Sequence, residues 1–250
     1  MFRVLPYILL TLLGLCVGSF LNVLIFRVPR GEEFVSTPSH CMRCGHRLKW
    51  YELIPILSYL LQRGKCRACK APLSAQYPLV EGLNGAAWLI TALLLRGDLL
   101  STGLYCALFS ILVVLALIDW RSFEIPEGLN IAIFVLGLVR LFTDLQNWKL
   151  YVIGMCSVSL VFLLLWLVTA GRGLGLGDVK LMASAGLLLG WPRTLLATLL
   201  GSLLGCIIHL IRMRFGAGRK LAFGPYLAAG IWISALFGAH IITAYLSLFM

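Results

Sequence analysis

Long apolar runs recur along the whole chain, and they constrain its fold more than any other feature. The 250 residues are 60% hydrophobic and only 12% charged, whereas a soluble domain is about half apolar and about a quarter charged. A helix of about 20 apolar residues is long enough to cross the ~30 Å hydrocarbon core of a bilayer. We therefore predict an all-α polytopic membrane protein.

Eight apolar segments are candidate transmembrane helices. The fourth and sixth are short for a full crossing, and tilt or flanking residues would have to extend them. The first continues to Phe26 without a small-residue cleavage site, so we expect a retained helix rather than a removed signal peptide. The segments lie at about 4–26, 79–96, 101–119, 128–143, 150–170, 178–190, 193–212 and 224–249.

Basic residues predict the orientation of these helices. With the N-terminus outside, the inner segments carry 16 of the 21 Lys and Arg residues. Positively charged loops stay on the cytoplasmic side, so we expect the polar insertion 27–78 in the cytoplasm. We therefore attribute the net charge of +11 to basic loops on the cytoplasmic side, next to the membrane lipid. The sequence lacks the aromatic-basic interleaving typical of nucleic-acid binding, so we expect no nucleic-acid partner. The five outer basic residues are Arg3, Arg96, Arg140, Lys149 and Arg193.

The sequence predicts three parts: a first transmembrane helix (1–26), a cytoplasmic domain (27–78) and a transmembrane core (79–250). The cytoplasmic domain carries two C-x-x-C pairs some 21 residues apart, a spacing typical of a tetrahedral Zn²⁺ site. Disulfides or a redox pair are the alternatives, but persistent disulfides are rare in the cytosol. Four cysteine ligands leave no open position for catalysis, so we expect a structural zinc. His40 and His46 lie beside the first pair and are alternative ligands, but we expect loop histidines of this kind to be solvated. The four expected ligands are Cys41, Cys44, Cys66 and Cys69.

Two of the ten acidic residues are placed unusually. Asp119 ends an apolar run, and Asp178 follows the glycine-rich stretch 171–177 and precedes another apolar segment. The predicted topology puts both at the cytoplasmic ends of helices, and an ionisable group at such a depth is a functional candidate. Two neighbouring carboxyls do not both ionise easily, which is the chemistry of an aspartic protease. The glycines before Asp178 would allow close approach of a helix or peptide.

Other interpretations of this pair stay open from the residues alone. Each aspartate is compatible with an interfacial acid, and Asp178 with a helix cap. A transporter or proton channel also uses intramembrane acids, although nearer the bilayer centre. A non-enzymatic assembly scaffold would not need either aspartate. Paired acids at one membrane face favour an aspartyl protease.

Motifs recur along nearly the whole chain, at 18–29, 38–41, 54–59, 64–69, 76–81, Ile118-Asp119 with Ile125-Pro126, 175–181 and 222–228. Together these motifs resemble those of the bacterial prepilin peptidases, the type IV prepilin leader peptidases of the GxGD intramembrane aspartyl protease family. The sequence departs from the family pattern at Met42, at Glu52-Leu53 and at Glu127, where an aspartate usually follows the proline. None of these departures touches the expected catalytic or zinc residues.

The resemblance implies an enzyme of the bacterial inner membrane. Such enzymes cut a short basic leader from type IV prepilins or type II secretion pseudopilins at the cytoplasmic face. Many are bifunctional and also methylate the new N-terminal amine with S-adenosylmethionine. The substrate's transmembrane helix would dock laterally beside the aspartates. The implied site comprises Asp119 and Asp178 as catalytic residues, supported by Gly175, Gly177 and Lys180; no residue is assigned to the methyl donor.

Overall fold

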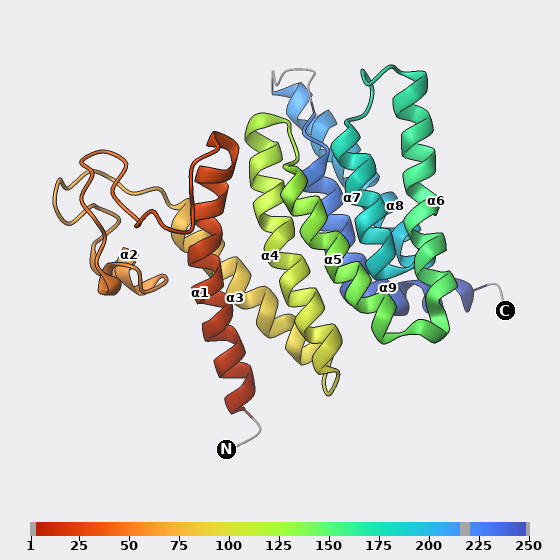
Figure 1. Cartoon of the computed structure of the whole chain (residues 1–250), viewed down its shortest axis with the longest axis horizontal. Coiled ribbons are helices and arrows are strands. Elements are labelled where there is room, and N and C mark those ends of the chain that lie inside the picture. The colour runs from red at the N-terminus through yellow and green to blue at the C-terminus, as the bar shows by residue number, and fades with distance from the viewer. Residues whose placement is uncertain (1–3, 216–220, 249–250) are drawn as a thin grey trace. The chain divides into compact units, whose positions relative to one another are not determined.

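The computed structural model describes residues 4–215 and 221–248, which are dominated by helices (Figure 1). Each of the eight predicted apolar segments coincides with a helix. Arg3, Arg219, Lys220 and Phe249, which the predicted topology includes, lie outside the described residues. The eight helices are α1 (Leu5–Arg27), α3 (Gln76–Leu94), α4 (Leu99–Ser122), α5 (Glu127–Thr143), α6 (Trp148–Val168), α7 (Leu176–Leu189), α8 (Trp191–Arg214) and α9 (Gly224–Leu246).

Five stretches of the described chain are long and apolar enough to cross a membrane. They are Leu5–Arg30, Leu99–Ser122, Leu145–Val168, Trp191–Arg214 and Gly224–Leu246. The other three helices have 19, 17 and 14 residues. At about 1.5 Å per residue, the 14 residues of α7 span only about 21 Å. The structure thus supports a multi-pass helical protein, and the count of eight crossings stays a prediction.

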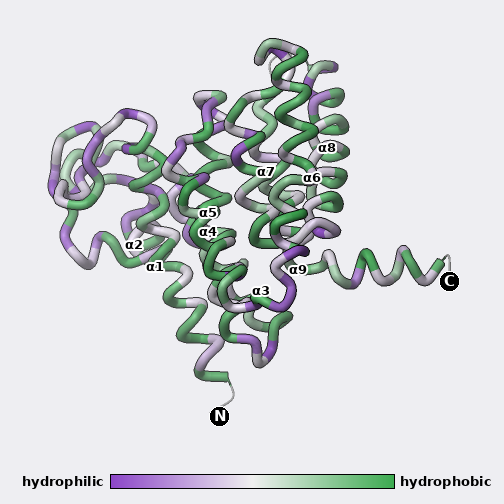
Figure 2. The backbone as a smooth tube through the Cα atoms, turned by 45° about the vertical axis from the view of Figure 1, so that its right-hand side comes forward, coloured by the Kyte–Doolittle hydropathy of each residue, from purple (hydrophilic) through white to green (hydrophobic). Residues whose placement is uncertain are grey.

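Apolar side chains stay exposed on the long helices, as lipid contact requires. On α6, Leu160, Leu164 and Leu167 are each about 60% exposed, and Figure 2 shows hydrophobic residues along the length of this helix. In a soluble protein such a surface would mark an interface or an aggregation site. In a bilayer it faces hydrocarbon.

Prolines start three of the helices. Pro6, Pro192 and Pro225 each occupy the first turn of α1, α8 or α9. Proline is favoured there because its fixed φ matches a helix and its missing N–H would have no intrahelical partner. Between α7 and α8, Gly190 adopts a φ of +79°, a conformation that glycine adopts at little cost.

The chain divides into two compact units, with the boundary between Val114 and Leu115 inside α4. In the first unit, α1 packs along α3 (Figure 1). A Cβ on Gly18 would lie 2.7 Å from the Cα of Glu81, so a glycine is required at this crossing. Asn84 donates to the carbonyl of Gly14 (2.7 Å) and accepts from the hydroxyl of Ser110 (2.8 Å), joining α1, α3 and α4 by buried polar contacts.

Residues 28–75 connect α1 to α3 and contain only the short helices η1 (Val28–Arg30), η2 (Trp50–Glu52) and α2 (Leu57–Leu61). Arg27 anchors the start of this segment. Its guanidinium is buried and donates to the carbonyls of Glu33 (3.1 Å), Thr37 (2.7 Å) and Pro38 (3.1 Å). A buried guanidinium needs such acceptors, so Arg27 holds the loop against the end of α1.

In the second unit, α7 is the central helix and packs against α5, α6, α8 and α9. Ten of its 14 residues are buried, which explains how so short a helix is held inside the unit. The crossing of α6 and α7 depends on a pair of glycines. A Cβ on Gly186 would lie 2.1 Å from the carbonyl oxygen of Gly154, so the two backbones are in direct contact.

Candidate active site and zinc centre

The two aspartates come from helix ends within the second unit. Asp119 lies in the last turn of α4 and Asp178 in the first turn of α7. Their exposed fractions are 5% and 7%. The carboxyl of Asp119 is near enough for its charge to act on that of Asp178. The fold therefore brings two buried acids, 59 positions apart in sequence, into one electrostatic environment.

A backbone amide from a third helix holds Asp119. The N–H of Gly224, the first residue of α9, donates to Asp119 Oδ2 at 2.9 Å. The start of a helix carries a partial positive charge and favours a neighbouring anion. A Cβ on Gly224 would lie 2.7 Å from that same oxygen. Position 224 therefore admits glycine and excludes larger residues unless the carboxyl moves.

Glycines also surround Asp178, as the sequence predicts. Gly175 is the N-cap of α7, in an extended conformation, and its carbonyl accepts the backbone N–H of Asp178 at 3.1 Å. A Cβ on Gly175 would lie 3.3 Å from Asp178 Oδ2. One on Gly177 would lie 3.0 Å from the Cβ of Ile125. The two glycines give the carboxyl room and let the chain before α5 approach α7.

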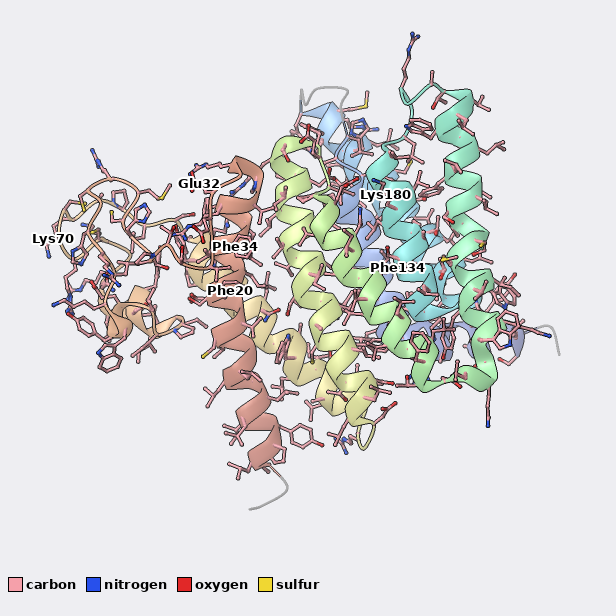
Figure 3. All side chains as sticks on the ribbon, viewed as in Figure 1. Phe20, Glu32, Phe34, Lys70, Phe134 and Lys180 are labelled. Atoms are coloured by element: carbon pink, nitrogen blue, oxygen red, sulfur yellow. The ribbon has the colours of Figure 1, made fainter. Side chains whose placement is uncertain are left out.

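Lys180 is labelled in Figure 3 and lies one turn of α7 away from the glycine N-cap. It forms an ion pair with Glu127, the first residue of α5, and both side chains are largely exposed. Glu127 is the residue where the sequence departs from the family pattern. Because Glu127 is also an acid, the departure keeps a carboxylate opposite Lys180. The sequence did not indicate this partner.

Aromatic and basic side chains gather around Trp120, the residue after Asp119. The guanidinium carbon of Arg212 lies 4.6 Å from the ring centroid of Trp120, and that ring is 6.5 Å from the ring of Tyr226. The Tyr226 hydroxyl is buried without a hydrogen-bond partner among the described residues, as is the side-chain amide of Asn130. Buried polar atoms normally have partners, so these two mark positions where a bound polar group would be stabilised.

Four of the six cysteines in the first unit, Cys41, Cys44, Cys66 and Cys69, form one cluster. Their sulfurs all lie within 4.8 Å of one another, with Cys41 to Cys69 and Cys44 to Cys66 at 4.0 Å. Tetrahedral zinc with Zn–S bonds of about 2.3 Å requires sulfurs about 3.8 Å apart. The cluster fits such an ion, and neither His40 nor His46 belongs to it.

The two C-x-x-C pairs repeat the same backbone structure. The N–H of Cys41 donates to His46 O at 2.9 Å, and the N–H of Cys66 donates to Ala71 O at 2.8 Å. Gly45 and Lys70 follow the last cysteine of each pair with φ values of +70° and +59°. Each turn thereby aims two thiols at one point. This short internal repeat was not evident from the sequence, because it lies in the backbone more than in the side chains.

Backbone hydrogen bonds favour the thiolate form at two of the four cysteines. Those from Arg43 and Cys44 lower the pKa of Cys41 to about 7, and the one from Cys69 lowers the pKa of Cys66. Against a backbone hydrogen bond from His46, burial and the hydrogen bonds of the neighbouring thiols raise the pKa of Cys44 to about 11. Zinc binds the thiolate form. Of the two nearby histidines, His46 pairs through Nε2 with Glu52 Oε2 at 3.2 Å, and the His40 ring lies 3.2 Å from the carbonyl of Pro38.

Two family models match successive parts of the chain. The model for the bacterial peptidase A24 N-terminal domain matches residues 12–95, and the model for the type IV leader peptidase family matches residues 106–210. The first match contains the cysteine cluster and the second contains both aspartates.

Curated relatives match nearly the whole chain. The prepilin leader peptidase/N-methyltransferase of Pseudomonas aeruginosa is 37% identical over 281 residues, covering 97% of this chain and 94% of the relative. The protein of the same name from Pseudomonas putida is 35% identical, with 93% and 91% covered. That from Myxococcus xanthus is 38% identical, with 85% and 64% covered. The search of solved structures found no match.

Proposed function

Because this chain belongs to the type IV leader peptidase family, we propose that it cleaves the basic leader from type IV prepilins or type II secretion pseudopilins. We also propose that it N-methylates the N-terminus released by the cut. The names of its relatives, which join a leader peptidase with an N-methyltransferase, support both activities. Their coverage of more than nine-tenths of the chain supports assigning both to this one polypeptide.

The observation that carries the peptidase proposal is the burial of two carboxyls, Asp119 and Asp178, close enough for the charge of one to act on the other. One carboxyl of such a pair holds a proton while the other is ionised. The ionised carboxylate takes a proton from a water molecule, which attacks the scissile carbonyl carbon. The protonated carboxyl donates to the carbonyl oxygen, and the C–N bond breaks as the departing nitrogen receives a proton.

Gly175, Gly177 and Lys180 act as supporting residues in this proposal. The glycines leave room beside Asp178 for an extended substrate backbone, since a Cβ on either would crowd a neighbour. Lys180 ties the start of α7 to α5 through Glu127. The hydrogen bond from Gly224 to Asp119 orients one oxygen of that carboxyl and leaves the other for chemistry.

Zinc is proposed to be structural. Cys41, Cys44, Cys66 and Cys69 would hold it, and its role is to fold residues 28–75, a segment too small to bury a substantial apolar core. S-adenosylmethionine supplies the methyl group for the second activity when bound. Neither group takes part in the hydrolytic step assigned to the aspartates.

The proposed membrane topology has eight crossings, with the N-terminus outside and the zinc domain in the cytoplasm. The excess of basic residues in the inner segments supports this orientation. The three shorter helices α3, α5 and α7 complete the count by tilting or by packing within the protein. In this proposal the protein lies in the bacterial inner membrane, with a first helix (1–26), a cytoplasmic zinc domain (27–78) and a transmembrane core (79–250). A prepilin reaches the active site from the lipid through its own transmembrane helix.

The test of the peptidase is cleavage of a prepilin by the purified protein in detergent. Asp119→Asn and Asp178→Asn each keep the side-chain size and remove the ionisable carboxyl, so each should abolish cleavage. Loss of general acid–base chemistry of this kind typically costs about 100-fold or more in rate. Unchanged thermal unfolding would show that both variants are folded.

A matched control is Asp98→Asn, because Asp98 lies in the turn before α4 and caps Ser101 rather than facing the pair. This variant should cleave at the normal rate. Normal processing by either Asp119→Asn or Asp178→Asn would refute the catalytic assignment.

A further inference from the structure

The short helix α2 exposes large apolar side chains that the proposed peptidase chemistry does not use. Leu57, Leu60 and Leu61 are 49%, 63% and 73% exposed. They are spaced i, i+3 and i+4, so they share one face of the helix, called here the leucine face. Trp50, which is 78% exposed, lies on η2, and η2 packs against α2. Exposed apolar side chains that gather in this way mark a contact with a membrane or a partner.

The opposite side of α2 faces the protein. Ser58 and Tyr59 are less exposed than the three leucines. The Tyr59 hydroxyl donates to the carbonyl of Leu73 at 3.4 Å, and a Cβ on Gly64 would lie 2.9 Å from the same hydroxyl. The helix is therefore amphipathic, with one side held by the cysteine segment (residues 28–75) and the leucine face turned outward.

Two contacts fix the start of α2 partway along the α1–α3 pair. The N–H of Ile56 donates to Glu81 Oε2 at 2.7 Å, and a Cβ on Gly82 would lie 3.7 Å from Ile56 Cδ1. Glu81 crosses α1 at Gly18, which is nine residues before Arg27, the last residue of α1. Nine helical residues correspond to about 14 Å. Figures 1 and 2 both show α2 level with the middle of α1 rather than beyond its end.

This level lies inside the bilayer if α1 crosses it. The stretch Leu5–Arg30 is long and apolar enough to do so, which puts Arg27 at the membrane boundary. Half of the ~30 Å hydrocarbon core is about 15 Å, so a point about 14 Å from Arg27 along α1 falls within one leaflet. On α3, Leu79 and Leu83 are 58% and 50% exposed on either side of Glu81 in the sequence. The same level of the unit therefore already presents apolar side chains to lipid.

The attachment of α2 is a strained and therefore specific feature of the fold. Ile56, the N-cap of α2, has a φ of +60° and a ψ of −51°, and such a conformation is rare and costly for a β-branched residue. The N–H of Leu57 donates to the carbonyl of Pro55 across this turn. Strain of this kind persists only where the surroundings enforce it, and the hydrogen bond to Glu81 does so here.

Basic residues accompany the apolar face. Residues 43–70 contain seven Lys and Arg residues and a single acid, Glu52. All seven basic residues are exposed. The cytoplasmic leaflet is rich in anionic lipid and attracts such residues, and tryptophan is favoured at the boundary between membrane and water. The seven are Arg43, Arg47, Lys49, Arg63, Lys65, Arg67 and Lys70.

We infer that α2 and Trp50 form a membrane anchor in the cytoplasmic leaflet, with the leucine face among the acyl chains and the basic residues on the phosphates of anionic phospholipids. The zinc domain then lies on the membrane and partly within it, as interfacial helices do, instead of standing free in the cytoplasm. Lipid is the occupant because the face lies at a level where α1 and α3 are themselves in lipid. The inference rests on the proposed membrane topology and is independent of the proposed enzymatic activities.

Photo-crosslinking tests the anchor in the full-length protein. Leu60→p-benzoylphenylalanine and Leu61→p-benzoylphenylalanine are reconstituted, one chain per particle, in nanodiscs of phosphatidylethanolamine and phosphatidylglycerol. The excited ketone inserts into neighbouring C–H bonds, so after irradiation the peptide that contains α2 should carry the mass of a phospholipid. Mass spectrometry measures the labelled fraction. One zinc ion per chain shows that the cysteine segment of each variant is folded.

Met42→p-benzoylphenylalanine is the matched control. Met42 is also apolar and 62% exposed, but it belongs to the first C-x-x-C turn rather than to α2, and it should carry little lipid. Absence of lipid adducts at both Leu60 and Leu61, or equal labelling at Met42, would overturn the anchor. A cross-linked pair of chains in detergent, without lipid adducts in nanodiscs, would instead assign the leucine face to a second copy of the chain.

The mass of the attached lipid tests the role of the basic residues. Phosphatidylglycerol should be enriched among the adducts relative to its share of the nanodisc lipid. Replacing both Arg63 and Lys65 with glutamine (Arg63→Gln, Lys65→Gln) should reduce this enrichment while the acyl-chain adducts remain. Adducts that mirror the lipid mixture in the protein with the native basic residues would overturn the part assigned to charge. Prepilin cleavage is not part of this readout, so the anchor and the proposed peptidase fail independently.

Discussion

At the scale of single residues, the carboxyl of Asp119 depends on a backbone contact that few substitutions would preserve. Gly224 donates its N–H to Asp119 and has no space for a Cβ. The motif around position 224 is visible in the sequence, but its partner 105 positions earlier is not. Only the packing of α9 in the second unit brings the two together.

Gly224→Ala tests this contact. The added Cβ should displace the carboxyl and lower the rate constant of prepilin cleavage by about 100-fold, since displacements of about 1 Å at a catalytic group have effects of this size. Thermal unfolding should change much less than the rate. Gly128→Ala is the control, because a Cβ at that position meets nothing within 4 Å, and it should cleave normally. A fully active Gly224→Ala enzyme would contradict the positioning role.

A second polar contact makes the stability depend on pH. Tyr151 donates to Asp144 Oδ2 at 2.6 Å, and this hydrogen bond, with Asn147 and Arg140 nearby, holds the pKa of Asp144 below its ordinary value of 3.8. A lowered carboxyl pKa stabilises the fold above the ordinary value, and the gain is lost as the pH falls through the lowered one. Tyr151→Phe should therefore lower the melting temperature at pH 7, with a smaller difference near pH 3.

Melting curves between pH 7 and pH 3 check this for four proteins: the wild type, Tyr151→Phe, Asp144→Asn and the variant with both substitutions. Asp144→Asn cannot ionise, so adding Tyr151→Phe to it should have the same effect at every pH. A difference between wild type and Tyr151→Phe that stays constant over the range would exclude the titration of Asp144 as its cause.

At the scale of helices, the position of Asp178 depends on how closely α7 packs against α6. The backbones touch at Gly154 and Gly186, without room for a Cβ on either. Small residues at such crossings allow helices to approach closely in a membrane. Because α7 has only 14 residues, packing against neighbouring helices stabilises it more than its own intrahelical hydrogen bonds do.

Gly186→Ala should separate α6 from α7. Overpacking of this kind typically costs roughly 1–3 kcal/mol, and the melting temperature should fall together with the rate of cleavage. Gly103→Ala in α4 is the comparison, because a Cβ there meets nothing within 4 Å and alanine favours a helix. An unchanged melting temperature for Gly186→Ala would argue against this crossing.

At the scale of the whole molecule, the chain divides its chemistry between two units. The cysteine cluster belongs to the first, and the aspartate pair belongs to the second. Removal of zinc should therefore affect the first unit more than the reaction at the aspartates.

Metal analysis of the purified protein should find one zinc ion per chain. Cys41→Ser and Cys66→Ser should each lower the zinc content and the melting temperature, because the metal folds residues 28–75. Cys206→Ser is the control, since Cys206 lies on α8 away from the cluster, and it should retain the metal. Full zinc occupancy in both Cys41→Ser and Cys66→Ser would refute the four-cysteine site.

The helices and the candidate residues followed from local patterns. Apolar runs predicted the positions of the eight helices, because an apolar segment buried in lipid must satisfy its backbone hydrogen bonds within itself and does so as a helix. The C-x-x-C spacing predicted the cysteine cluster, because a short turn is enough to aim two thiols at one ion. The acids at helix ends identified Asp119 and Asp178, whose roles the cleavage experiment tests.

Contacts between distant segments came only from the tertiary structure. Glu81 is buried five residues after the start of α3 and accepts the N–H of Ile56. The partners Gly224 for Asp119 and Glu127 for Lys180 likewise lie far apart in sequence. The sequence by itself determined which residues are apolar, thiol-bearing or acidic at a membrane face. Helix packing alone decided which partners the acids meet, because close backbone contacts depend on shape and leave no periodic signal in the chain.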